Sequence, residues 1–222
     1  MHTDGAIRGV PVLVQTRRVR VLCVGGGTVA SRKIAGLIAG GAAVRVVAPV
    51  LSDPLTDAEA AGAVAWEART YRHGDIGDAH LVVAATDDPA VNAEVADAAD
   101  AAGRLCVRVD DGAQGSIAMM AAVHRDPLVL AVATTTGAPS LARVLRAELA
   151  DAYGPEYGEL AALCTGLRAD VRVTVALANL SIDERRARWR ALTRPDILDL
   201  IRAGHLDEAK EAALACLLSS SD

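Results

Sequence analysis

The stretch VRVLCVGGGTVASRK, residues 19–33, decides the fold, because a short apolar run meets three glycines and then a segment with helical spacing. Residues 21–24 have the continuous apolar character of a strand that is buried on both faces of a parallel sheet. Ile34, Leu37 and Ile38 follow with the spacing of one helix face. The stretch therefore predicts a strand, a tight turn and a helix.

The turn matches the pattern G-x-G-x-x-A, with Gly25, Gly27 and Ala30 at its defined positions. In this pattern the first glycine makes the tight turn, the second lets a pyrophosphate approach the backbone, and the small third residue lets helix and strand pack closely. The anion would lie on free N–H groups at the helix N-terminus. Glycine-rich turns also serve as plain connections, so that alternative stays open, but the flanking strand and helix favour a dinucleotide site.

Composition and charge exclude several classes of protein. The chain has 222 residues, 52% of them hydrophobic, which is enough for one sizeable α/β domain and a smaller appendage. The formal net charge of −5 argues against nucleic acid as the main partner. No apolar run approaches the roughly 18 residues that span a bilayer, and no signal peptide precedes the first strand. We therefore expect no membrane partner and a cytoplasmic location.

The cysteines and histidines give no sign of a metal centre. The four cysteines are scattered and form no C-x-x-C pair, so we expect reduced, mostly buried thiols. The five histidines form no cluster along the chain. No metal ligand is predicted.

Strand and helix patterns alternate up to about residue 150. Further strands are predicted at residues 43–48, 64–66, 80–86, 105–109 and 128–133, and further helices at residues 55–62, 90–102 and 140–150. This alternation predicts a parallel, doubly wound sheet of the Rossmann type. An apolar run at residues 10–14 is either an edge strand or a lead-in. From residue 151 on the pattern is helical, including residues 171–175, 184–189 and 206–218, and predicts a small helical domain.

The tip of the second strand lacks the acidic residue that a Rossmann unit usually places there to hold the ribose hydroxyls. The sequence at this place is Ala48, Pro49 and Val50, and Asp53 lies too far along. No arginine stands there to favour a 2′-phosphate. NAD is therefore preferred to NADP only slightly.

Asp110 is the residue expected to do chemistry. It follows the strand at residues 105–109 at the carboxyl edge of the sheet, and a carboxylate with an ordinary pKa of about 3.9 is available as a base at neutral pH. The alternative is that Asp110, Asp111 and Gly112 form a simple turn. Asp88 has two open explanations as well, a helix cap followed by Pro89 or a cofactor contact.

A third group of candidates follows the strand at residues 128–133. Thr134, Thr135 and Thr136 could offer hydroxyl and backbone N–H groups to an anion, or form an ordinary strand exit. Several arginines are near in sequence and suggest a polycarboxylate ligand, because guanidinium binds carboxylate bidentately. They are Arg108, Arg125, Arg143 and Arg146, although a solvated helix face explains Arg146 equally well.

These landmarks, in this order, resemble the bifunctional precorrin-2 dehydrogenase/sirohydrochlorin ferrochelatase family, which comprises the first domain of sirohaem synthase and its free-standing relatives. The matching segments cover nearly the whole chain, and their combination is far more specific than any one of them. They are VGGGTVASRK (24–33), AATDDPAVN (84–92), CVRVD (106–110), PLVLAV (127–132), APSLAR (138–143) and ERRARW (184–189).

The resemblance implies three parts and an intertwined homodimer. Residues 1–112 would be the NAD-binding Rossmann domain, residues 113–150 a dimerisation segment and residues 151–222 a helical C-terminal domain. Carried over by position, the cofactor would be bound by Gly25, Gly27, Thr28, Val29, Pro49, Val50 and Thr86. Asp110 matches the family's essential aspartate, and the tetrapyrrole would contact Thr134, Thr135, Thr136 and Arg143.

The activity implied is the NAD-dependent oxidation of precorrin-2 to sirohydrochlorin in sirohaem biosynthesis. Fe²⁺ insertion is a second activity of the family, and whether it is retained stays open. The chain departs from the family at Val107, where asparagine is usual, and at residues 133–138, where a serine with paired glycines is common. A separate enzyme is expected to supply precorrin-2, because no methyltransferase domain follows residue 222.

Two other functions remain as alternatives. One is a non-catalytic homologue that binds NAD or a tetrapyrrole, which the altered threonine segment suggests. The other is a regulatory NAD-sensing domain of the ion-transport type. The missing acid near Pro49 and the ERRARW segment count against this last class.

Overall fold

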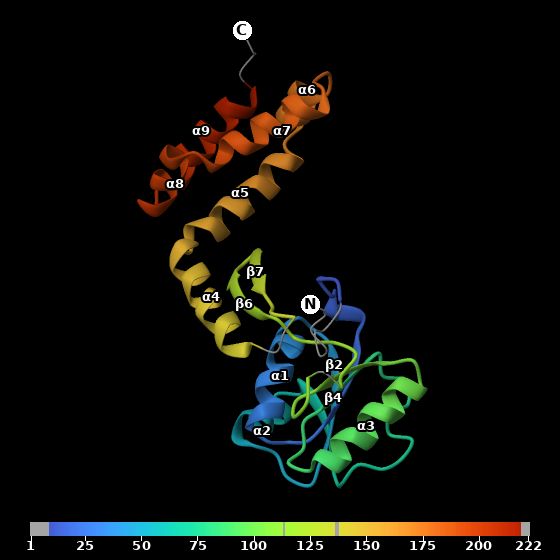
Figure 1. Ribbon diagram of the computed structural model, residues 1–222. Helices are drawn as coiled ribbons and strands as arrows, with labels where there is room; N and C mark the ends of the chain where they lie inside the picture. Colours follow the sequence, from blue (N-terminus) through green and yellow to red (C-terminus); the bar gives the residue numbers. More distant parts are fainter. Residues whose placement is uncertain (1–8, 113, 136–137, 219–222) are drawn as a thin grey trace, which may run out of the picture. The chain divides into compact units, whose positions relative to one another are not determined.

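The computed structural model describes residues 9–112, 114–135 and 138–218 (Figure 1). The described chain forms two units. The first contains the residues up to Met119 together with Thr135, and the second contains residues 120–134 and 138–218. Each unit has its own hydrophobic core.

The first unit is built on a parallel sheet of five strands in the order β3-β2-β1-β4-β5. The chain reverses its direction of winding between β1 and β4, which is where open α/β sheets bind ligands. After a short 3₁₀ turn η1 (Thr16–Arg18), the elements are β1 (Arg20–Val24), α1 (Thr28–Ala39), β2 (Ala43–Ala48), α2 (Asp53–Ala60), β3 (Val64–Ala68), β4 (Leu81–Ala84), α3 (Pro89–Ala101) and β5 (Leu105–Arg108).

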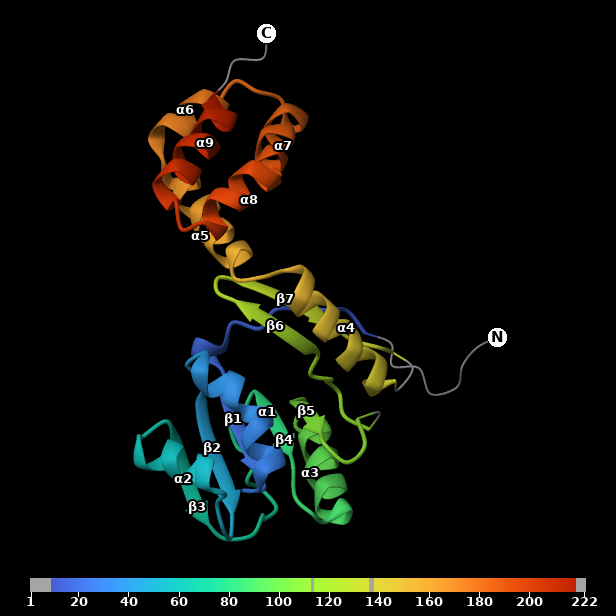
Figure 2. The ribbon, with the colours of Figure 1, turned by 90° about the vertical axis from the view of Figure 1, so that its left-hand side faces the viewer.

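Helices cover both faces of this sheet. Ile34 of α1 and Leu55 of α2 are buried in the core on one face, and Val95 and Ala99 of α3 are buried in the core on the other. Figure 2 shows α1 and α3 on different sides of the strands. The central strands are apolar on both faces because both faces are covered, as is usual for parallel sheets. The predicted Rossmann-type fold is confirmed.

The second unit combines a β-hairpin with six helices in its described residues. Its elements are β6 (Ala121–Arg125), β7 (Leu128–Val132), α4 (Pro139–Ala152), α5 (Glu156–Ala169), α6 (Val171–Leu177), α7 (Ile182–Arg190), the 3₁₀ turn η2 (Ala191–Thr193), α8 (Pro195–Arg202) and α9 (Leu206–Leu218). The helix α4 lies along the hairpin (Figure 2). The helices α5 to α9 pack around one core that includes Leu167, Leu192, Ile197 and Leu217.

Two strands, β6 and β7, differ from the prediction. The strand predicted at residues 128–133 exists as β7, but it pairs antiparallel with β6 and does not extend the parallel sheet. The sequence of β6 does not alternate clearly between apolar and polar residues. Val123 is the one residue of this strand that is fully buried. Pairing across the Asp126–Pro127 turn makes it a strand. The apolar run at residues 10–14 forms no strand in the described chain, and Leu13 is 82% exposed.

None of the described helices is both long enough and apolar enough to cross a membrane. The helix α4 ends just before Tyr153, and α5 begins three residues later. Residues 171–175 belong to the helix α6, as predicted.

Candidate active site

The turn after β1 requires glycine at two positions for steric reasons. Gly25 has φ +117°, and a Cβ atom there would lie 2.1 Å from the carbonyl oxygen of Ala85. A Cβ atom on Gly26 would lie 2.1 Å from the carbonyl oxygen of Val50. The first strand tip therefore packs directly against the backbone that follows β4 and β2.

Gly27 is different, because a Cβ atom there would meet no described atom within 4 Å. It is the N-cap of α1, and no side chain in the described chain caps this end of the helix. The amide groups of Thr28 and Val29 lie in the first turn, where an α-helix has no internal acceptor for them. Both residues are exposed. This open, positively polarised helix end has the shape and charge that fit a pyrophosphate.

The end of β2 lies beside the same turn. The amide of Ser52 donates to the carbonyl of Gly26 at 2.7 Å, and Trp66 of β3 donates from Nε1 to the carbonyl of Ala48 at 2.9 Å. Pro49 and Val50 project from this place and are exposed, Val50 by 74%. They therefore offer an apolar surface next to the glycine turn.

Thr86 follows β4 and is held by Asn92 of α3. The Oδ1 atom of Asn92 accepts hydrogen bonds from the Thr86 amide at 2.9 Å and from Thr86 Oγ1 at 2.8 Å. The Nδ2 atom of Asn92 donates to the Thr86 carbonyl at 3.0 Å. Asn92 is completely buried at 0% exposure, so these bonds form away from competing water.

The neighbouring Asp88 has a structural role. Its Oδ1 atom accepts a hydrogen bond from the amide of Ala90 at 2.8 Å, and Pro89 is the first residue of α3. The helix-cap explanation of Asp88 is therefore confirmed.

Asp110 follows β5 and contacts two side chains. Its Oδ1 atom accepts a hydrogen bond from Asn92 Nδ2 at 3.1 Å. Arg108 binds it bidentately, from Nε to Oδ1 at 3.1 Å and from Nη2 to Oδ2 at 2.8 Å. The Arg108 guanidinium, and to a smaller extent the Asn92 amide, lower the pKa of the Asp110 carboxyl. The carboxylate is therefore ionised at neutral pH.

Asn92 thus joins Thr86 to Asp110 across two adjacent strand ends, since β4 and β5 are hydrogen-bonded neighbours. The sequence analysis gave Asn92 no separate role, and it suggested Arg108 as one of several arginines for a polycarboxylate ligand, whereas Arg108 pairs with Asp110. The signal for Asn92 was a polar residue at a buried helix position, spaced with Val95 and Ala96. No local pattern could indicate the contact of Arg108 with Asp110, because arginines at strand ends are usually solvated.

The candidates Arg125, Thr134 and Arg143 belong to the second unit. Arg125 donates from Nη2 to the carbonyl of Ala150 at 3.2 Å and so binds the end of α4. Arg143 is exposed on α4. Thr134 is half-buried and Thr135 is exposed, while Thr136 lies outside the described residues.

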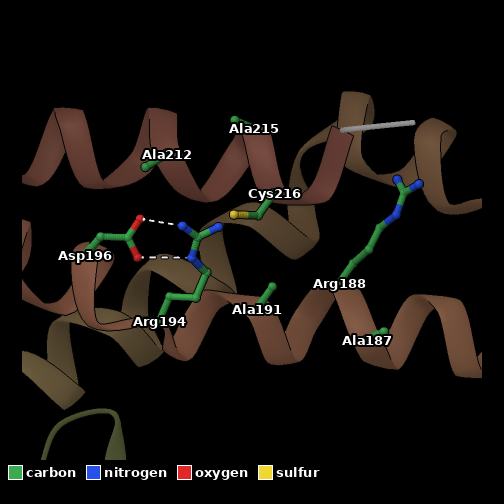
Figure 3. A pocket seen from close by; sticks show the side chains of 8 residues that line it. All are labelled: Ala187, Arg188, Ala191, Arg194, Asp196, Ala212, Ala215 and Cys216. Carbon is green, nitrogen blue, oxygen red and sulfur yellow. Dashed lines mark hydrogen bonds and ion pairs between the residues drawn. The ribbon is translucent and has the colours of Figure 1, made fainter. Parts of the chain in front are cut away.

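A separate groove of about 610 Å³ lies between α7 and α9 in the second unit (Figure 3). Its floor consists mainly of small side chains, and its two arginines are already bonded. Arg188 donates to the carbonyl of Leu217 at 2.7 Å, and Arg194 pairs with Asp196 at 3.0 Å. Both arginines of the groove therefore already have partners within the protein.

No group of three or more histidine, cysteine or acidic side chains in the described chain could hold a metal ion. Burial raises the pKa of the Cys23 thiol to about 12 and that of Cys106 to about 11. These two thiols are therefore protonated and unreactive at neutral pH.

Two family models match the chain. Residues 12–121 match a family described as putative NAD(P)-binding, and residues 156–217 match the sirohaem synthase dimerisation region. The first match contains the glycine turn and Asp110. The second lies in the part that the sequence analysis predicts as the helical C-terminal domain.

Full-length curated relatives and a solved structure agree with these matches. The chain is 38% identical over 202 residues to siroheme synthase 1 of Yersinia enterocolitica, covering 91% of this chain and 42% of the relative. It is 38% identical over 204 residues to siroheme synthase of Pseudomonas fluorescens, covering 90% of this chain and 42% of the relative. The chain therefore spans about two fifths of the length of these curated relatives.

The solved structure of SirC, a precorrin-2 dehydrogenase, superposes with a TM-score of 0.73 at 25% identity and covers 92% of this chain and 100% of the SirC chain. The similarity thus extends over both the parallel sheet of the first unit and the helices of the second. With these matches, the chain belongs to the precorrin-2 dehydrogenase/sirohydrochlorin ferrochelatase family.

Proposed function

We propose that the protein is an NAD-dependent precorrin-2 dehydrogenase that forms sirohydrochlorin in sirohaem biosynthesis, and that it works in the cytoplasm. The observation that carries the proposal is the chain of contacts from Thr86 through Asn92 to Asp110 at two adjacent strand ends. These contacts lie in the first unit, where β1 is followed by the open N-terminus of α1, which no side chain caps. The likeness to SirC supports the same reaction.

The cofactor would be held at the glycine turn. Gly25 lets β1 and β4 approach each other, and Gly27 leaves space in which the pyrophosphate reaches the amides of Thr28 and Val29. Pro49 and Val50 would flank the adenosine, and Thr86 would lie near the nicotinamide. In this arrangement the backbone binds the charge of the cofactor, because no side chain at residues 48–50 is acidic or basic.

Asp110 would be the catalytic residue. Oxidation of precorrin-2 removes a hydride and a proton, and NAD⁺ when bound supplies the hydride acceptor. The ionised Asp110 carboxylate would stabilise the positive charge that develops on the substrate and take up the proton. Asn92 and Arg108 hold this carboxylate in place before substrate arrives.

Substrate binding and the chelatase step are finer proposals. The acidic side chains of a tetrapyrrole would be bound by the exposed Arg143 and by hydroxyl groups of Thr134, Thr135 and Thr136. If Fe²⁺ is a second substrate, Asp110 would accept protons from pyrrole nitrogens as the ion enters. The separation of residues 1–112, 113–150 and 151–222 into cofactor, dimerisation and helical parts belongs to the same proposal.

A homodimer is supported by an incompletely covered helix in the second unit. All residues of α4 are described and none of them is fully buried, while Leu141 and Val144 are 51% and 54% exposed. Apolar side chains three residues apart on one helix form a stripe that is typical of a contact surface. The family model for the dimerisation region adds support through residues 156–217.

The test is an assay with precorrin-2 and NAD⁺, made once with and once without Fe²⁺. We expect NADH and the sirohydrochlorin absorbance to appear together, and Asp110→Asn to slow kcat by about 10²- to 10⁴-fold. Asp88→Asn is the matched control, because Asp88 is also a strand-end aspartate but caps a helix. It should retain kcat.

Calorimetry with NAD⁺ completes the design. Asp110→Asn should bind NAD⁺ as the wild type does, since the carboxylate lies beyond the pyrophosphate site in this proposal. If precorrin-2 is not turned over with either NAD⁺ or NADP⁺, the proposed dehydrogenase activity is wrong. Tight binding of NAD⁺ or tetrapyrrole without turnover would instead support the non-catalytic binding homologue.

A further inference from the structure

Three arginine–aspartate pairs among the described residues have the same spacing and nearly the same geometry. Each arginine lies two residues from its aspartate and donates from Nε to Oδ1 and from Nη2 to Oδ2. In the three pairs Nε lies 3.1 Å from Oδ1, and Nη2 lies 2.8, 2.7 and 3.0 Å from Oδ2. They are Arg108–Asp110, Arg172–Asp170 and Arg194–Asp196.

The pair at Asp110 differs from the other two in its surroundings. The Arg108 side chain is 14% exposed, whereas those of Arg172 and Arg194 are 64% and 57% exposed. Exposed ion pairs contribute little, because water and salt screen them. Because the Arg108 side chain is less exposed, water and salt screen its charge less than they screen the charges of Arg172 and Arg194. Its attraction to Asp110 is therefore stronger.

The Asp110 carboxylate also has a second anchor. Asn92 donates to Oδ1, the same oxygen that receives the Arg108 Nε hydrogen bond. Arg108 in turn approaches the carbonyl of Pro89 at the start of α3, with Nη2 at 3.5 Å. Two donors from different elements therefore leave the carboxylate a single orientation.

The charges around this pair come from three places. Arg108 lies on β5 itself, Asp111 follows Asp110 in the chain, and Asp97 of α3 acts on Arg108 through space. Both additional groups are acidic. Without Arg108, these negative charges would favour protonation of Asp110. Among the described residues, Arg108 is the cation that pairs with this carboxylate.

We propose that Arg108 is a positioning residue that holds the Asp110 carboxylate in the orientation in which it contacts Asn92. The effect of Arg108 on catalysis rests on the proposed function, whereas its effect on the orientation of Asp110 does not. A carboxylate held in this way acts first as a fixed negative charge beside the substrate and only second as a proton acceptor. Arg108 is consequently unavailable for binding the carboxylates of a substrate.

The first test measures the ionisation of Asp110 without cofactor or substrate. In protein labelled with ¹³C at aspartate carboxyl carbons, the Asp110 resonance is titrated in the wild type, Arg108→Met and Arg108→Lys. We expect the pKa of Asp110 to rise in Arg108→Met toward about 3.9 or above. Arg108→Lys should give an intermediate pKa, because it restores the charge but not the bidentate geometry.

Arg172→Met is the matched control. Its loss should release Asp170, whose pKa the Arg172 guanidinium lowers to about 2, and leave the pKa of Asp110 unchanged. A crystal structure of Arg108→Met provides a second measurement that is independent of the acid stability of the variant. We expect the Asp110 side chain to leave the orientation in which it meets Asn92.

Kinetics then separate positioning from a merely structural role. Arg108→Met should lower kcat on the order of 10²-fold with little change in KM for NAD⁺, and move the acidic limb of the kcat profile to higher pH. An unchanged Asp110 pKa together with an unchanged side-chain orientation would overturn the proposal. If the wild type does not oxidise precorrin-2, the titration and the crystal structure still decide the role of Arg108.

Discussion

Asp88 and Asp110 follow neighbouring strands of one sheet, and their partners give them different roles. Asp88 accepts a hydrogen bond from a helix amide, whereas Asp110 receives hydrogen bonds from Asn92 and Arg108. A carboxylate that caps a helix is occupied by the backbone. A carboxylate held by two side chains remains available to a ligand on its exposed side, which for Asp110 is 24% of the side chain.

The glycines of the turn allow a prediction at the scale of single residues. Gly25→Ala should destabilise the fold by about 2–4 kcal/mol, because the new Cβ meets the Ala85 carbonyl and the backbone has positive φ. Gly27→Ala should cost about 1 kcal/mol or less, since its Cβ meets open space. Denaturant unfolding measures both values.

The Gly27→Ala substitution should weaken cofactor binding more than it lowers stability. Gly27→Ala is expected to remain folded but to bind NAD⁺ at least about tenfold more weakly, because the methyl group occupies space reserved for the pyrophosphate. Calorimetry measures this affinity. Unchanged NAD⁺ affinity in folded Gly27→Ala would contradict the proposed position of the pyrophosphate.

At the scale of elements, an ionic network ties the edge of the sheet to the loop that follows it. Arg45 of β2 binds Glu67 of β3 at 2.8 Å, and Glu67 also bonds Arg69. Arg69 in turn donates to both carboxylate oxygens of Asp75, at 2.7 and 2.8 Å. The network thus links two strands and the loop that leads toward β4.

Asp75→Asn should lower the free energy of unfolding at pH 7 and lose this effect in acid. The Arg69 guanidinium lowers the pKa of Asp75 in the folded protein, so its contribution is present above the unfolded pKa of about 3.9. It is lost as the pH falls through the folded pKa. Unfolding of wild type and variant at a series of pH values should therefore show a difference that closes below about pH 4.

Asp78→Asn is the control for this experiment. Asp78 also pairs with an arginine, Arg20, at 2.8 Å, but its side chain is 82% exposed. Solvent screening makes such a pair nearly neutral for stability. Equal effects of the two substitutions at pH 7 would show that the network adds nothing beyond an ordinary surface pair.

The ERRARW segment shows how a family motif can serve packing within an element. Glu184 completes a capping box with Ser181 at the start of α7. Arg188 binds the carbonyl of Leu217 in α9, and Arg168 of α5 lies 5.1 Å from the ring centre of Trp189. The motif therefore stabilises the helical unit, and its residues need no contact with substrate to be explained.

At the scale of the whole molecule, the two units have different relations to the proposed partners. The first unit carries the glycine turn and Asp110, and the second carries α4 and the match to a dimerisation region. The exposed apolar stripe of α4 would be costly in water for an isolated chain. A second copy of the chain is the partner that we propose for it.

The double substitution Leu141→Asp with Val144→Asp should convert the proposed dimer to a monomer, because two carboxylates would be buried in an apolar contact. Sedimentation velocity measures the mass. Arg146→Asp introduces a carboxylate at another position around the same exposed helix and should leave the dimer intact. A dimer that survives the double substitution would shift the interface to residues 156–217.

The sequence by itself determined the elements whose causes are local. The apolar run before the glycines predicts β1, the spacing of Ile34, Leu37 and Ile38 predicts α1, and residues 43–48 are predicted with the bounds that β2 has. Local patterns suffice here because burial on both faces and backbone freedom at glycine act within a few residues. The order of motifs also identified the family.

Only the tertiary structure decided how separate elements meet. Pairing made a strand of β6 and placed β7 outside the parallel sheet. The fold joined Asn92 to Asp110, 18 residues apart, and enclosed Arg108 against it. Such contacts depend on distances through space between strand ends and a helix, which hydrophobic periodicity does not encode. The sequence therefore named the candidate carboxylate, and the fold selected the side chains that hold it.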